Sequence, residues 1–362
     1  MTDSSDPNDN GIDIGRRRIL HGALGGGATL ATMAAGMGIS PAALAAGKHD
    51  AQLPDHPNYK FVFVNHVTTN PFFVPTQYGA ADACAAFGCS YQWTGSQTSE
   101  PREMVNAMHA AISSGADGIA VALVDQSAFN APIDRALKAG IPVVSYNADV
   151  DNDRLAYIGQ KLFDAGKALG ERIVQEVDSG DVVGFIATPG QLNIQPRMNG
   201  AKAAIEASGK DITLHQVASG PTVNEEFNRI ESFYLGHRDI KGMFAVDAGS
   251  TEGIAKTMKK HGLADKGIKG GGFDMLPGTL DGIEAGDLSF TIDQQPYMQG
   301  FMPVTELFLY KVSGGLSGMA NINTGLKFVT KDNVGQYLNT KSRFEGNSNK
   351  QKVLSRSGPI SS

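Results

Sequence analysis

Short apolar runs alternate with amphipathic helical patterns along the chain from residue 59 onward. The runs have the length and the continuous hydrophobicity of strands buried on both faces of a sheet. They are Phe61–Val64, Gly118–Leu123, Ile141–Tyr146, Val182–Ala187, Ile212–Val217, Met243–Val246, Ile268–Phe273 and Phe290–Ile292. The helical patterns between them include Glu103–Ser114, Phe163–Val177, Met198–Ser208 and Thr251–His261. This alternation predicts an α/β fold with mostly parallel sheets that carry helices on both faces.

The number of strand–helix units is too large for one open sheet with short connections. The chain has 362 residues, which suits two domains better than one core. We therefore expect two doubly wound parallel-sheet lobes joined by a hinge. The first lobe would comprise residues 59–160 and 294–322, and the second residues 161–293 and 323–332. Residues 333–362 are rich in Asn, Ser, Lys and Gly, so we expect a polar tail there.

Residues 1–45 resemble a twin-arginine export signal. Arg16 and Arg17 precede a Gly/Ala-rich apolar stretch that ends at Ile39, and Ala43 and Ala45 suit a small-residue cleavage site. The alternatives are a disordered basic leader or a membrane anchor, but the stretch is too short and too rich in glycine to span a bilayer well. No cysteine lies near the cleavage site, so a lipid anchor is not indicated. We expect an exported soluble protein in the periplasm, where an outer membrane would retain it.

Composition and missing motifs narrow the function. The net charge is only −6 and its signs are mixed, so a nucleic-acid partner is not expected. The sequence has no Gly-x-Ser-x-Gly elbow and no phosphate-binding loop, and its 8 histidines are scattered, so we expect no catalysis, metal or cofactor. Its two cysteines, Cys84 and Cys89, fit either a disulfide or two packed thiols.

Polar side chains follow the apolar runs at the positions where ligands bind open α/β sheets, beyond the carboxyl ends of the strands. Asn147, Asp247, Asp274 and Gln294 each end or follow such a run, and Asn70 follows the first. Each of these residues taken alone also suits a helix cap, because Asn and Asp are favoured there. Gathered around one cleft, they would form a binding site for hydroxyl groups.

Two adjacent phenylalanines, Phe72 and Phe73, follow Asn70 and Pro71. Both rings cannot easily face the core of one lobe. One ring would then line the cleft and stack on the apolar face of a sugar ring. The alternative is a pair of core phenylalanines.

The chain resembles the ribose-type periplasmic sugar-binding proteins, whose fold is the type I "Venus flytrap". The stretches that carry the resemblance are Asn70–Phe73, Ile141–Val143, Pro196–Gly200, Phe227–Ile230, Phe244–Asp247, Gly272–Asp274 and Thr291–Gln294. The resemblance implies that Phe72 and Phe73 stack on the ligand from the first lobe and Phe227 from the second. It also implies that Asn70, Arg197, Asp274 and Gln294 bind hydroxyls, and that three crossovers join the lobes.

The chain departs from that family at positions that contact the ligand. Asn147 and Ala148 stand where ribose binders carry an Asp–Arg pair, Ala122 stands in place of Asn, and Asp247 also replaces an Asn. Ribose is therefore not assured as the ligand. His66, Gln195 and Gln295 are candidates to compensate, although a structural role is the better expectation for His66.

The charges of the expected site indicate a neutral ligand. Two carboxylates, Asp247 and Asp274, face one guanidinium, Arg197, and a buried anionic ligand would leave charge uncompensated. We therefore expect a monomeric binding component of an ABC importer that captures a neutral sugar or sugar alcohol and delivers it to a permease driven by a separate ATPase. The alternatives are an exported sugar sensor that feeds a chemoreceptor or sensor kinase, and a secreted glycosidase that uses Asp247 and Asp274.

Overall fold

The computed structural model describes residues 53–338. Within them, two six-stranded sheets have the orders β11-β5-β4-β3-β1-β2 and β12-β10-β9-β8-β6-β7. The predicted fold class, two α/β lobes with parallel sheets, is confirmed. The expected export signal (1–45) and the expected tail beyond residue 338 lie outside the described residues. No helix of residues 53–338 is long and apolar enough to cross a membrane.

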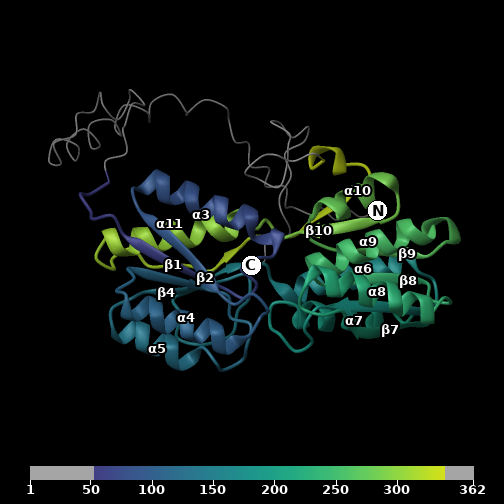
Figure 1. The fold of residues 1–362 in the computed structure, drawn as a ribbon, viewed down its shortest axis with the longest axis horizontal. Helices are drawn as coiled ribbons and strands as arrows, with labels where there is room; N and C mark the ends of the chain where they lie inside the picture. The colour runs from purple at the N-terminus through teal and green to yellow at the C-terminus, as the bar shows by residue number, and fades with distance from the viewer. Residues whose placement is uncertain (1–52, 339–362) are drawn as a thin grey trace, which may run out of the picture. The chain divides into compact units, whose positions relative to one another are not determined.

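The first lobe is built on a sheet whose strand pairs are all parallel. Its strands are β1 (Lys60–Asn65), β2 (Ser90–Gly95), β3 (Gly118–Val121), β4 (Val143–Tyr146), β5 (Ala156–Gly159) and β11 (Ile322–Asn323). Its helices are η1 (Pro71–Phe73), α3 (Val74–Phe87), α4 (Pro101–Ser113), α5 (Asn130–Lys138) and α11 (Met298–Val312). Helix α11 packs beside α3, and α4 packs beside α5 across the sheet from them (Figure 1).

The second lobe repeats this plan with one antiparallel edge strand, β12, which pairs with β10. Its strands are β6 (Gly180–Ile186), β7 (Ile212–Ala218), β8 (Gly242–Ala245), β9 (Lys269–Phe273), β10 (Phe290–Asp293) and β12 (Lys327–Thr330). Its helices are α6 (Leu162–Glu176), α7 (Gln195–Ser208), α8 (Val223–Gly236), α9 (Ala248–His261), η2 (Ala264–Lys266), α10 (Pro277–Ala285) and η3 (Val334–Gln336). One apolar core lies under α6 and α7, and the other lies under α8, α9 and α10.

The chain passes between the two sheets three times, after β5, after β10 and after β11. In each lobe the first strand, β1 or β6, lies between the second and third strands. The loops that follow the first and third strands therefore leave the same end of the sheet in opposite directions, which opens a crevice there. The strand-end residues singled out in the sequence lie at these crevices.

Two local features complete the fold. Cys84 is buried at the end of α3, Cys89 is partly buried just before β2, and both are free thiols. The segment that begins the expected polar tail folds as η3, and Val334 and Tyr337 are buried in the core of the second lobe.

Candidate functional site

A cavity of about 40 Å³ receives side chains from both lobes. Eight of the nine predicted site residues line it, together with His66, Asn193, Ile194 and Ala248; the eight are Asn70, Phe72, Phe73, Asn147, Arg197, Asp247, Asp274 and Gln294. That space holds only a few water molecules, at ~10–15 Å³ each. A sugar ring therefore enters only when the cleft widens.

The first lobe contributes the turn between β1 and α3. Asn70 accepts a hydrogen bond from the Phe72 backbone N–H at 3.0 Å and caps η1, with Pro71 in its first turn. Asn70 is thus both a helix cap and a lining residue. The rings of Phe72 and Phe73 meet edge to face at 4.7 Å, and Phe73 also packs against Trp93 in the core. Because the cap fixes the turn, it holds the Phe72 ring at the cavity.

The carboxyl ends of β4 and β9 carry Asn147 and Asp274, both in the left-handed backbone region, with φ of 63° and 73°. Non-glycine residues adopt this region at an energetic cost and often do so at binding sites. Asp274 Oδ1 accepts from Gln294 Nε2 at 2.7 Å. Asn147 Nδ2 in turn donates to Gln299 Oε1 at 3.2 Å. Gln299 Nε2 donates to Gln294 Oε1 at 3.1 Å. This chain of amides connects the strand ends of the two lobes through the crossover after β10.

Arg197 enters the site from the first turn of α7. Its Nη1 donates to the Val246 carbonyl and its Nη2 to Gln160 Oε1, both at 3.0 Å. Its guanidinium lies 4.2 Å from the centre of the Phe273 ring, where the ring attracts the cation. Burial lowers the pKa of Arg197, and the nearby Asp274 opposes that shift.

Close backbone packing of α6 against α7 fixes the position of that arginine. A Cβ atom at Gly166 would overlap the carbonyl oxygen of Arg197, and one at Gly200 would overlap that of Phe163. Only glycine permits this approach. The backbone of Arg197 is therefore held close to α6.

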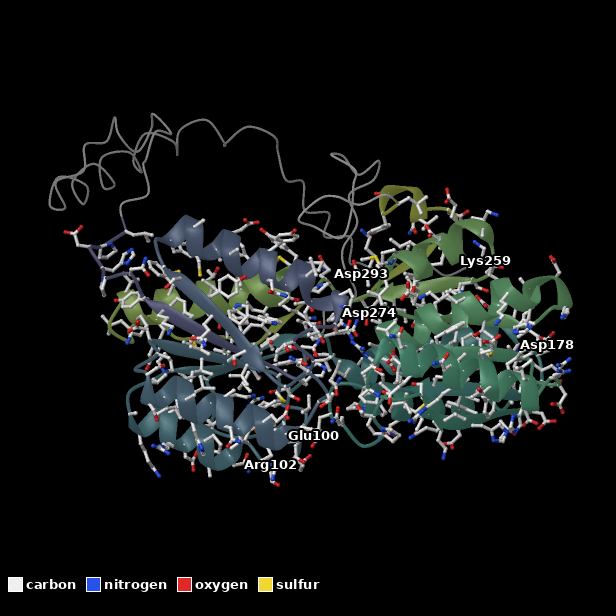
Figure 2. All side chains as sticks on the ribbon, viewed as in Figure 1. Glu100, Arg102, Asp178, Lys259, Asp274 and Asp293 are labelled. Atoms are coloured by element: carbon white, nitrogen blue, oxygen red, sulfur yellow. The ribbon has the colours of Figure 1, made fainter. Side chains whose placement is uncertain are left out.

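Asp274 is 4% exposed and lies with Asp293 at the ends of neighbouring strands (Figure 2). Burial raises the pKa of Asp274 to about 7, although Arg197 and Gln294 act in the opposite direction. The folded protein therefore holds this carboxylate at a free-energy cost. Donors from a bound ligand would relieve that cost.

Asp247 is largely occupied by its own lobe. It accepts from the backbone N–H groups of Ala187 and Ser250, each at 2.9 Å, as the cap of α9. Buried Glu226 lies against it, and burial together with Asp247 raises the pKa of Glu226 to about 10. A protonated Glu226 then donates to Asp247, which leaves the latter fewer free acceptors for a ligand.

Three residues considered in the sequence do not line the cavity. Phe227, expected to stack from the second lobe, is half-buried on α8 against Gly253 of α9. Gln195 bonds to Asn199 and Gln216, and Gln295 donates to the Thr324 carbonyl at 2.6 Å. Among the residues that line the cavity, the aromatic rings therefore all come from the first lobe.

Two further residues, His66 and Asn193, line the cavity although the sequence did not predict them as site residues. His66 directly follows β1 and Asn193 lies in the loop between β6 and α7, and their side chains meet at 3.1 Å. The place of His66 at a strand end was a usable signal. Nothing in the spacing of the loop identified Asn193.

The acidic and imidazole groups of the site do not assemble into a metal centre: in residues 53–338 there is no group of three or more His, Cys, Asp or Glu suited to hold a metal ion.

The sequence pattern described as a periplasmic binding protein domain matches residues 61–312. The chain belongs to this family. Among its relatives in the periplasmic binding protein family is the xylose/arabinose-binding protein XylF of Sulfolobus acidocaldarius, 49% identical over 86% of this chain and 80% of that protein. The D-ribose/D-allose-binding protein of Pseudomonas aeruginosa is 25% identical over 67% of this chain and 79% of its own length.

A solved structure supports the same family fold. A solute-binding protein of an ABC transporter from Burkholderia graminis, in complex with D-arabinose, superimposes with a TM-score of 0.73. It is 25% identical, and the match covers 79% of this chain and all of the other. The two named relatives and this solved structure are thus sugar-binding members with the same family fold.

Proposed function

We propose that this protein captures a neutral monosaccharide of the pentose class between its lobes and delivers it to the permease of an ABC importer. The observation that carries the proposal is the shared cavity, where Asp274, Arg197 and amide groups from both lobes meet beside Phe72. Carboxylates accept from sugar hydroxyls, a guanidinium donates to them, and amides do both. The phenyl ring covers an apolar face of the sugar.

The charge of the cavity supports an uncharged guest. Arg197 already faces Asp274, whose attraction it feels, so the pair is close to neutral before any ligand arrives. An added phosphate or carboxylate would be buried without a free counter-charge, which costs several kcal/mol. Hydroxyl groups, by contrast, complete the hydrogen bonds of both side chains.

The pentose assignment is supported by the names of a relative and of a similar solved structure. One relative is named for xylose and arabinose binding, and the Burkholderia graminis protein was solved with D-arabinose. Binding then proceeds by a shift of population from an open form to a closed form that ligand contacts from both lobes stabilise.

We propose that the protein acts outside the cytoplasmic membrane, exported by the twin-arginine-type signal at residues 1–45. The relative from Sulfolobus acidocaldarius comes from an archaeon without an outer membrane. The proposed role therefore does not depend on a periplasm. It requires only that the binding protein meets its permease on the outer side of the membrane.

Calorimetry and thermal shift with D-xylose, D- and L-arabinose, D-ribose, D-glucose and xylitol test the proposal. We expect at least one pentose to bind, and a ligand at 100 times its Kd to stabilise the protein by about 2.7 kcal/mol. Asp274→Ala should remove binding, whereas Asp265→Ala, at an exposed position of η2, should not. If no sugar binds, or if Asp274→Ala binds as tightly as the wild type, the proposal is wrong.

Two further assays separate delivery from the other roles considered. Cells that lack the gene should lose uptake of the labelled sugar, and the Asp274→Ala variant should fail to restore it. Loss of chemotaxis or of sugar-induced transcription with normal uptake would instead indicate a sensor. Nitrophenyl xylosides and arabinosides should release no nitrophenol, since release would indicate a glycosidase.

A further inference from the structure

Three consecutive residues of the loop between β6 and α7 contact the first lobe. Gln191 and Ser99 exchange two hydrogen bonds, at 2.6 and 2.8 Å. The Leu192 N–H donates to the Val124 carbonyl at 3.0 Å. The Asn193 side chain contacts His66 at 3.1 Å. Residues 191–193 thus join the second lobe to the first beside the cavity.

The outermost of these contacts has its polar groups in use. Gln191 Oε1 accepts from the hydroxyls of Ser99 and Thr188, and Gln191 Nε2 donates to the Ser99 carbonyl. Gln191 does not line the cavity. The hydrogen bonds of Gln191 therefore hold the two lobes together, and its side chain is not directed at a ligand in the cavity.

The innermost contact differs. Asn193 Nδ2 can only donate, so His66 Nε2 accepts, and a neutral His66 carries its proton on Nδ1. Burial lowers the pKa of His66 to about 4, which keeps the ring neutral at ordinary pH. The pair thus leaves one donor, His66 Nδ1–H, and one acceptor, Asn193 Oδ1. Both atoms are buried, and within residues 53–338 neither has a hydrogen-bond partner.

A third unpartnered atom belongs to another residue that lines this cavity. Arg197 Nε is also buried without a partner in the described chain, although both terminal nitrogens of that guanidinium are engaged. Buried polar atoms are nearly always satisfied in folded proteins. That three such atoms belong to residues lining one cavity indicates that a polar guest completes them.

We propose that His66 and Asn193 together determine sugar specificity by reading one region of the guest, with His66 Nδ1–H donating to a hydroxyl oxygen and Asn193 Oδ1 accepting from a hydroxyl. This inference rests on the proposed function. The pair joins residues of different lobes, so it exists only when the cleft is closed. The pair therefore contacts the hydroxyl groups of the sugar only as the cleft closes.

The test is a cycle between protein variants and monodeoxy sugars. Binding of the best pentose and of each of its monodeoxy analogues is measured by calorimetry for the wild type and Asn193→Leu, whose side chain has a similar size without polar atoms. His66→Phe is added because it keeps the ring that packs edge to face on Phe73. For the wild type, one or two analogues should lose about ten-fold or more in affinity because a buried partner is left unpaired.

Each variant should bind the analogue that lacks the hydroxyl contacted by the replaced residue within about two-fold of the parent sugar, because the coupling between two groups disappears when either is removed. Gln191→Leu is the matched control. It breaks the neighbouring contact between the lobes but leaves the cavity unchanged, so it should weaken all sugars by the same factor. His66→Gln and Asn193→Ala, measured in the same cycle, replace any variant whose circular dichroism shows that it does not fold.

The outcomes separate the two proposals. If the wild type binds no aldose, the proposed function fails and the inference fails with it. If the wild type binds a pentose but the variants keep its full sensitivity to every deoxy position, the inference alone is overturned. A uniform loss across all analogues, as expected for Gln191→Leu, would also overturn it, because the pair would then only close the lobes.

Discussion

Replacing Asp274 by Asn should make the ligand-free protein more stable and the binding of sugar weaker. The folded-state pKa of Asp274 is about 7, against 3.8 for an unburied aspartate. The folded chain therefore binds this proton more tightly than the unfolded chain, and stability falls as pH rises from 3.8 to about 7. At ~1.4 kcal/mol per pK unit the full difference is about 4 kcal/mol. The attraction of Arg197 is already contained in that pKa.

The side chain of Asn keeps an oxygen for the Nε2 donor of Gln294 and has no charge to desolvate. Urea unfolding of both proteins should give similar stabilities near pH 4 and an advantage for Asp274→Asn that grows up to pH 8. Calorimetry at pH 8 should show at least about ten-fold weaker sugar binding, because hydrogen bonds to charged groups contribute about 1.5–3 kcal/mol. Equal stability of the two proteins at every pH would refute the reasoning, and Asp265→Asn is the exposed control.

The remaining predictions concern packing and support around the site. Glu226→Gln should gain stability over the wild type as pH rises from 4.5 to about 10, because the folded protein keeps Glu226 protonated over that range; a pH-independent difference in urea midpoints would contradict this. Gly200→Ala should lower the melting temperature because its Cβ would overlap the backbone of α6. Gly236→Ala, at the last residue of α8 with open space around it, should raise the free energy of unfolding by ~0.4–1 kcal/mol. Gln160→Leu should weaken sugar affinity measured by calorimetry, because it removes the acceptor that holds Arg197 at 3.0 Å.

The apolar runs of the sequence predicted most of the strands, but they missed β2 and β5. Strands buried on both faces must be continuously apolar, which is why Phe61–Val64 marked β1. Strand β2 (Ser90–Gly95) lies at an edge of its sheet and is only partly buried, so its sequence carries no apolar run. Strand β5 was missed because it is only four residues long, with the polar Tyr157 in it.

The candidate site followed from sequence where position along a strand decides it. Asn147 and Asp274 end apolar runs, and the fold brings strand ends together. Phe227 was placed from family resemblance, and the structure instead turns its neighbour Glu226 toward Asp247. Asn193 was missed because its partner is 127 residues away, and no local pattern encodes such a contact.

The position of α11 in the chain bears on the order in which the lobes are completed during synthesis. Val304, Leu307 and Phe308 of this helix are fully buried in the core of the first lobe, yet they follow five of the six strands of the second. A ribosome-bound chain that ends before Met298 therefore exposes the apolar surface that α11 will cover, and such surfaces invite aggregation or chaperones. The lobe that emerges from the ribosome first therefore stays incomplete until five strands of the second lobe have been made.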